Sequence, residues 1–129
     1  MKSERQRMQM VERQLASRDI IDSRVLSAMG RVQREKFVDP EYRQNAYLDG
    51  PLPIDCGQTI SQPYIVALMT QALGLQGREE VLEIGTGSGY AAAVLAEIAD
   101  RVTTIETITE LAQHAESLLT SLGYTNIQV

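Results

Sequence analysis

The chain has 129 residues, enough for one domain or for part of one, and its hydrophobic fraction of 43% supports a buried core and argues against global disorder. The formal net charge is −5, and the basic residues of the first 45 positions alternate with acidic ones, which favours a solvated helix face over a nucleic-acid-binding surface. A single cysteine excludes an internal disulfide, and neither a membrane-spanning run nor a secretory signal is found, so we expect a cytoplasmic protein without membrane partners.

Helices are expected in the first third of the chain. Three apolar residues recur at helical spacing and predict an amphipathic helix: Met8, Val11 and Leu15. Asp22 can cap a second helix, which Gly30 would end and whose apolar positions are Val25, Leu26 and Met29. Residues 38–60 hold three of the four prolines, and we expect a long irregular segment, of the kind that is often functional.

A third helix is predicted from Gln62 or Pro63 to Leu73. Proline suits a first helical turn because its missing N–H is not needed there, and Gly74 is a natural stop. The expected buried face consists of Ile65, Leu68, Met69, Ala72 and Leu73.

The stretch from 81 to 106 is the most informative part of the sequence. Residues 81–84 are typical of a buried parallel strand, residues 90–99 of a helix, and residues 102–106 of a second strand that ends at Glu106. Between the first strand and its helix lie three glycines: Gly85, Gly87 and Gly89. Glycines allow a sharp turn and a close approach of the backbone to a ligand.

The last part of the chain predicts another helix and a third strand. Thr107 and Glu110 have the spacing of a capping box. The buried face of the helix would comprise Leu111, Ala115, Leu118 or Leu119, and Leu122, and Gly123 would end it. With a strand at 127–129, we expect an α/β fold with three parallel strands in the spatial order 3-2-1, half of a Rossmann-like sheet, and a ligand at their carboxyl ends.

The spacing of the glycines separates two cofactor classes. The dinucleotide pattern G-x-G-x-x-G is not met, because position 90 is Tyr, and this disfavours a nicotinamide-dependent oxidoreductase. Glu83, two residues before the first glycine, could meet a cationic amine, and Glu106 could bind ribose hydroxyls. S-adenosylmethionine carries an amine and a ribose but no pyrophosphate, so it fits this pattern. The alternative is a plain strand-to-helix turn.

At this point the sequence resembles a known family. Residues 83–90, Glu-Ile-Gly-Thr-Gly-Ser-Gly-Tyr, are similar to the first motif of class I S-adenosylmethionine-dependent methyltransferases. Residues 47–54 and 57–64, the latter reading Gly-Gln-Thr-Ile-Ser-Gln-Pro-Tyr, resemble protein-L-isoaspartate O-methyltransferases, as do residues 10–15 and 32–38. The resemblance implies S-adenosyl-L-methionine as cofactor and, as partners, damaged proteins and peptides with L-isoaspartyl or D-aspartyl residues, whose carboxylate is methylated for repair.

The resemblance also implies roles for single residues. It makes Ser61 the active-site serine, facing both the substrate carboxylate and the cofactor; the alternative is that Ser61 only caps the following helix. Gln58 and Thr59 are expected to line the same pocket with the cofactor, or else to form a turn. No metal site is expected, because His114 is the only histidine and no cluster of ligand residues accompanies it.

Members of this family are usually longer than this chain. We therefore expect residues 1–129 to form one incomplete methyltransferase domain, with a helical and loop segment at 1–60 and half of a cofactor-binding core at 61–129. The strand at 81–84 would then lie at a sheet edge, where it could pair with a second copy. The alternative to an active enzyme is a catalytically inactive fragment that folds, self-associates and at most binds the cofactor weakly.

Overall fold

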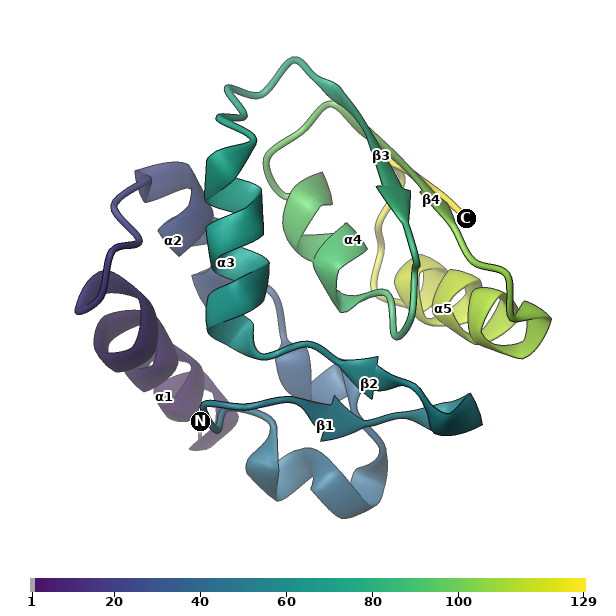
Figure 1. The fold of residues 1–129 in the computed structure, drawn as a ribbon, viewed down its shortest axis with the longest axis horizontal. Helices are drawn as coiled ribbons and strands as arrows, with labels where there is room; N and C mark the ends of the chain where they lie inside the picture. The colour runs from purple at the N-terminus through teal and green to yellow at the C-terminus, as the bar shows by residue number, and fades with distance from the viewer. Residues whose placement is uncertain (1) are drawn as a thin grey trace.

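The computed structural model describes residues 2–129. The chain begins with helices, and its second half alternates parallel strands with helices (Figure 1). The N-terminal part contains α1 (Lys2–Met10), η1 (Val11–Ala16), α2 (Ser23–Arg31), η2 (Arg34–Phe37), η3 (Pro40–Asn45), β1 (Leu52–Pro53), η4 (Asp55–Gly57) and β2 (Thr59–Ile60). The remainder contains α3 (Pro63–Ala72), β3 (Glu80–Ile84), α4 (Tyr90–Ala96), β4 (Arg101–Ile105), α5 (Thr109–Ser121) and β5 (Ile127–Gln128).

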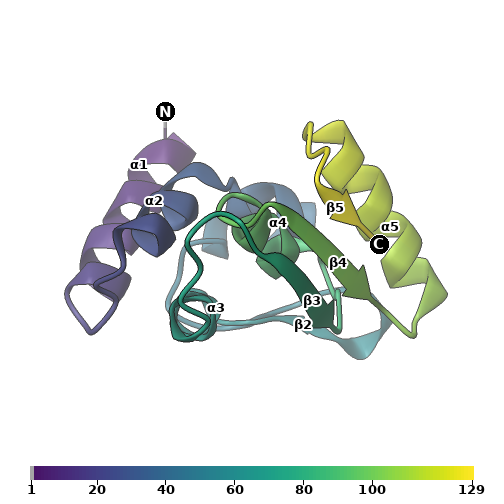
Figure 2. The same cartoon turned by 90° about the horizontal axis from the view of Figure 1, so that it is seen from above.

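The parallel sheet has the predicted order. Its strands are arranged β3-β4-β5, with Ile84 opposite Ile105 and Val102 opposite Ile127. Seen from above, α1 and α2 lie at one end of the molecule and α5 at the other, with α4 between them (Figure 2). The predicted spatial order 3-2-1 is therefore confirmed, and β3 forms one edge of the sheet.

The N-terminal helices differ from the prediction in their phase. Met8 is exposed, whereas Met10 and Leu15 are buried, because the chain passes from α1 into the wider turns of η1 and its inward face shifts. The Asp22 cap is confirmed, since its carboxylate accepts a hydrogen bond from the Arg24 N–H at 2.9 Å. Gly30 does not end α2 but lies within it, where its carbonyl accepts a hydrogen bond from Arg7 Nε at 2.8 Å.

The segment at 38–60 is more regular than the sequence indicated. Short helical turns occupy part of it, and β1 and β2 pair as an antiparallel ribbon with Leu52 opposite Ile60. This ribbon leads directly into α3, so it fixes the start of that helix.

The buried face of α3 was predicted wrongly except for Leu68, which is half-buried and packs against the core. Pro63, Val66, Ala67 and Thr70 are buried, and they face α2 and η1, where small side chains allow close packing. The larger apolar residues Ile65, Met69 and Leu73 are exposed on the other side of the helix. The pattern of apolar residues alone could not distinguish these faces, because both are apolar.

The ends of the last two helices also differ. α4 closes at Ala96 rather than Ala99, and α5 begins at Thr109 after Ile108, so the predicted capping box is not formed. Of the two residues predicted as alternatives on the inward face of α5, Leu118 and Leu119, it is Leu119 that is buried.

The sheet leaves an apolar surface uncovered. Leu82 is 60% exposed and Ile84 74% exposed, and Ile105 on the neighbouring strand is exposed as well. The second edge of β3 is unpaired within residues 2–129. No helix of this part of the chain is both long and apolar enough to cross a membrane.

We predict that the isolated 129-residue chain self-associates through the β3 edge, because unpaired strand edges and exposed apolar surface favour pairing with another chain. Ile84→Lys should weaken the association measured by sedimentation at micromolar concentrations. Ile21→Lys is the matched control. Ile21 is also an exposed isoleucine, at 84%, but it lies just before α2 and not in the sheet. A chain that sediments as a monomer, or equal effects of both substitutions, would contradict the prediction.

Candidate functional site

The glycine loop is held against the end of β4 by backbone hydrogen bonds. After β3 ends at Ile84, the N–H groups of Gly85 and Thr86 donate to the Ile105 carbonyl at 2.7 and 3.2 Å. The next N–H, that of Gly87, donates to Glu106 Oε1 at 2.8 Å. The carboxyl ends of two parallel strands thus meet at one loop, as expected for the ligand site of such sheets.

Glu106 connects the loop to the start of α5. Its second oxygen, Oε2, accepts a hydrogen bond from the Ile108 N–H at 3.1 Å. The predicted capping box of Thr107 and Glu110 is absent because Ile108 is the N-cap of α5, and the Glu106 carboxylate lies beside Gly87. A carboxylate held by two backbone donors keeps a fixed orientation, and its remaining lone pairs can accept hydrogen bonds from a ligand.

Glu83 places a second carboxylate near the same loop. Its Oε1 accepts a hydrogen bond from Thr104 Oγ1 at 2.6 Å, and Thr104 Oγ1 also lies 2.6 Å from Thr86 Oγ1. Burial raises the pKa of the Glu83 carboxyl, the Thr104 hydrogen bond opposes this, and the neighbouring Glu106 carboxylate raises the pKa further. Two acidic groups in a partly buried site favour a cationic ligand.

The three glycines have different roles. Gly85 and Gly87 line the cleft, and a Cβ on Gly85 would meet open space. Gly87 has φ +54°, a conformation that side-chain-bearing residues rarely adopt. Gly89 does not line the cleft; a Cβ there would lie 3.4 Å from Ala115 and Leu119 of α5, so this glycine allows α4 and α5 to pack closely.

A cavity of about 420 Å³ lies between the glycine loop and α3. One wall carries Glu83 and Gly87, and the other carries Thr59 and Ser61, so the two sequence motifs meet across this cleft. Gln58 is not among the lining residues; it lies in the turn between β1 and β2, where its main chain bonds to Ile54 and Asp55. The backbone of Gln58 therefore forms the turn that was predicted as the alternative to a place in the cofactor pocket.

Ser61 does not cap the following helix. The N-cap of α3 is Gln62, and no side chain caps the helix there. Within residues 2–129 the Ser61 hydroxyl forms no hydrogen bond, while its carbonyl accepts one from Arg34 Nη2 at 3.0 Å. The hydroxyl is thus available to a ligand in the cleft.

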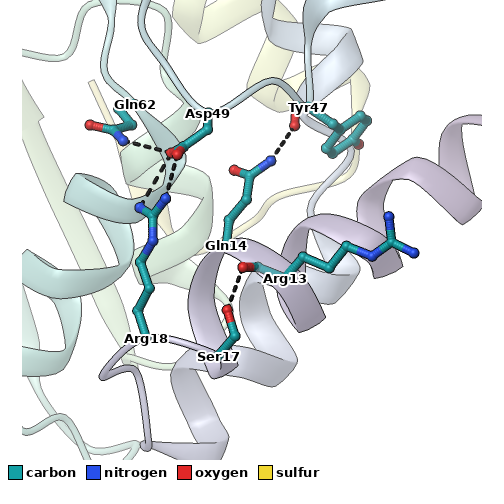
Figure 3. Close-up of polar contacts among 7 residues, drawn as sticks. All are labelled: Arg13, Gln14, Ser17, Arg18, Tyr47, Asp49 and Gln62. Carbon is teal, nitrogen blue, oxygen red and sulfur yellow. Dashed lines mark hydrogen bonds and ion pairs between the residues drawn. The ribbon is translucent and has the colours of Figure 1, made fainter.

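A surface network holds the chain next to Ser61. The Gln62 amide donates to Asp49 Oδ1 at 2.6 Å, and Arg18 forms an ion pair with the same carboxylate (Figure 3). Nearby, Gln14 Nε2 donates to the Tyr47 carbonyl at 2.6 Å. Gln14 of η1 therefore anchors the segment before β1, and Arg18, which follows η1, anchors the start of α3 through Asp49.

Sequence reasoning missed two groups that shape the site. Thr104 belongs to no sequence motif. Its hydrogen bond to Glu83 follows only from the register of β3 against β4, which places the two residues opposite each other. Arg34 lies in the stretch at 32–38 that carried part of the family resemblance, but its burial is not indicated by its residue type.

Comparison with known proteins connects this site to one family. The family model described as protein-L-isoaspartate(D-aspartate) O-methyltransferase matches residues 5–129. A protein-L-isoaspartate O-methyltransferase of Syntrophus aciditrophicus is 54% identical over 126 residues, which cover 98% of this chain and 58% of the relative. Protein-L-isoaspartate O-methyltransferase 1 of Syntrophobacter fumaroxidans is 61% identical over 123 residues, covering 95% and 58%. The chain spans about half the length of the curated relatives it matches.

Solved structures support the same fold. A protein-L-isoaspartate O-methyltransferase superposes with a TM-score of 0.81 at 25% identity, covering 97% of this chain and 40% of that one. A putative protein-L-isoaspartate O-methyltransferase of Plasmodium falciparum, in complex with S-adenosyl-L-homocysteine, gives a TM-score of 0.78 at 25% identity, covering 95% and 61%. The expected partial Rossmann-like methyltransferase fold is thereby confirmed.

Gly89→Ala should lower the free energy of unfolding by more than the roughly 1–2 kcal/mol of a left-handed backbone alone, because the added methyl group also presses on α5. Gly74→Ala is the matched control, since Gly74 also has a positive φ, of 63°, but open space around it. Urea denaturation of both chains measures the difference. Equal losses would show that packing against α5 contributes nothing.

Proposed function

Because the chain belongs to the protein-L-isoaspartate(D-aspartate) O-methyltransferase family, we propose that it carries the cofactor site and active-site serine of an enzyme that methylates isoaspartyl carboxylates in damaged proteins. One observation carries the proposal: the Ser61 segment and the glycine loop that follows Glu83 face each other across a single cleft, and this loop also binds the Glu106 carboxylate. We also propose a cytoplasmic location, which the unpaired Cys56 supports.

The residues of the cleft fit S-adenosyl-L-methionine. Glu83 would meet the amine of its methionine part, and Gly85 and Gly87 leave room for its approach. Glu106 does not line the cleft itself, but its carboxylate binds the Gly87 N–H beside it and would accept hydrogen bonds from the ribose hydroxyls. When bound, this cofactor supplies a methyl group activated by a positively charged sulfur. The Plasmodium falciparum relative, solved in complex with S-adenosyl-L-homocysteine, supports the assignment. For Gln58 and Thr59 a cofactor role remains a proposal, weaker for Gln58, which does not line the cleft.

The chain's own residues would act on the substrate by positioning. An ionised carboxylate is already a competent nucleophile, so no general base is required. Ser61 would donate a hydrogen bond from its hydroxyl to one carboxylate oxygen and leave the other directed at the reacting carbon. The apolar side chains of Ile65 and Met69, which line the same cleft, would exclude water from the reacting groups.

The uncovered surface beside β3 supports a second possibility. The cleft is bordered by the unpaired edge of β3, where Leu82 and Ile84 are exposed. With this side of the cleft open, the 129-residue chain by itself would bind the cofactor but would not turn over a substrate. It would then be an inactive fragment.

Methyl transfer to an isoaspartyl peptide, compared with the matching aspartyl peptide, tests the proposed activity. In a protein that carries this chain, Ser61→Ala should lower the rate by about ten- to a hundredfold, the effect of losing one hydrogen bond to a charged group. Ser117→Ala, on the exposed surface of α5, is the control. Transfer to both peptides alike would contradict the proposed substrate. Cofactor binding without transfer would favour the inactive fragment.

Glu106→Gln should weaken S-adenosylhomocysteine binding by about 1–3 kcal/mol, because an amide binds hydroxyl donors less strongly than a carboxylate. Glu116→Gln, which makes the same change of charge on the exposed surface of α5, should leave binding unchanged. Isothermal titration calorimetry measures both, with NAD as the comparison ligand. No effect of Glu106→Gln would remove Glu106 from the site, and equal affinity for NAD and S-adenosylhomocysteine would contradict the proposed cofactor class.

The affinity for S-adenosylhomocysteine should rise with pH at values above the ordinary glutamate pKa of about 4.3. The pKa of Glu83 is raised, so this carboxyl becomes ionised only at a higher pH, and the ligand amine requires the ionised form. Binding should therefore release protons, which calorimetry in two buffers of different ionisation enthalpy detects. In Glu83→Gln this pH dependence should disappear. If it persists unchanged, another group controls binding.

A further inference from the structure

Arg34 is a charged residue in the middle of the core. Its side chain is 0% exposed, and no carboxylate within residues 2–129 forms an ion pair with it. Burial lowers the pKa of its guanidinium, and one of its nitrogens, Nη1, has no hydrogen-bond partner. Burying a charge without a counter-ion disfavours folding, and a well-packed apolar side chain would avoid that penalty. The residue therefore calls for an explanation other than stability.

The contacts of Arg34 join three separate segments. Its Nε donates to the Ala46 carbonyl at 2.6 Å, and its Nη2 donates to the Ser61 carbonyl at 3.0 Å. The guanidinium lies over the Tyr90 ring, 4.8 Å from the ring centroid. Tyr90 is the first residue of α4 and directly follows the glycine loop, and the Phe37 ring packs against it edge-on at 5.6 Å.

These contacts connect the two sides of the cleft from within the core, where Arg34 is buried. Ser61 and Tyr90 both line the cavity, one on each side, whereas Arg34 does not line it. The guanidinium is rigid and planar, so the group that lies over the Tyr90 ring and the N–H groups that donate to the Ala46 and Ser61 carbonyls move as one unit. A single side chain thereby sets the position of the Ser61 main chain relative to the helix that begins at the glycine loop.

We propose that Arg34 is a positioning residue for Ser61, which holds the active-site serine in register with the glycine loop by binding its carbonyl while stacking on Tyr90. The importance of this role for methyl transfer rests on the proposed function. The positional role itself does not, because it concerns the ligand-free chain. A lysine could not replace the arginine, since its ammonium has no plane with which to stack and donate to both carbonyls together.

Amide hydrogen exchange, followed by mass spectrometry, tests the proposal on the 129-residue chain. The variant is Arg34→Met, which fills a similar volume without donors. Exchange over residues 60–66, where the Ile65 and Val66 amides donate to the Gln62 carbonyl, should rise by about ten- to a hundredfold, the range expected for one lost hydrogen bond to a charged group. Exchange over 101–105, in the central strand, should rise far less. Arg31→Met is the matched control, because Arg31 is an exposed arginine that pairs with Glu97 and should alter neither segment.

The outcomes separate positioning from a general structural role. If Arg34 only stabilised the fold, both segments would exchange faster by the same factor, and that result would overturn the proposal, as would unchanged exchange over 60–66. Should Arg34→Met fail to fold, Arg34→Lys is measured instead, with the same local pattern expected at a smaller size; failure of both to fold would also overturn it. Absence of methyl transfer in a longer protein that carries this chain would count against the proposed function alone.

Discussion

The register of β3 against β4 is the constraint on which the site depends. Because the strands are parallel and Ile84 lies opposite Ile105, the residues that follow each strand emerge at the same edge of the sheet. The Ile105 carbonyl then accepts hydrogen bonds from the first two amides of the glycine loop, and Glu106 accepts one from the third. A shift of one residue would turn Glu83 to the opposite face and separate Glu106 from the loop.

The N-terminal half supplies the other wall of the cleft, and its position depends on polar contacts rather than on the sheet. The β1–β2 ribbon leads to Ser61, whose carbonyl is bound by Arg34, while Gln62 is tied through Asp49 to Arg18. Such contacts specify one arrangement because each donor has a single acceptor at the right distance. Apolar packing is non-directional, so it would not by itself fix the position of this segment against its neighbours.

The sequence predicted the parts in which local pattern and tertiary structure agree. The strand at 81–84, the glycine loop and the Asp22 cap depend on short-range chemistry, and all three are found where expected. The buried face of α3 could not be predicted, because its exposed side carries Ile65, Met69 and Leu73 and is as apolar as the side that packs on α2. The capping box is not formed because α5 begins one residue later than predicted, with Ile108 rather than Thr107 at its N-cap. The burial and the role of Arg34 could not be predicted, because both depend on contacts with residues far away in the sequence.

The central claim is that the edge where β3 and β4 end binds an adenosyl cofactor. Titration of the isotope-labelled chain with S-adenosylhomocysteine, followed by NMR of the backbone amides, tests it most directly. The account predicts that the shifts cluster at 83–89 and 105–108, with a smaller group at 59–61 across the cleft. Saturable shifts confined to another region, such as the polar surface around Arg24 and Glu97, or none at all, would contradict it.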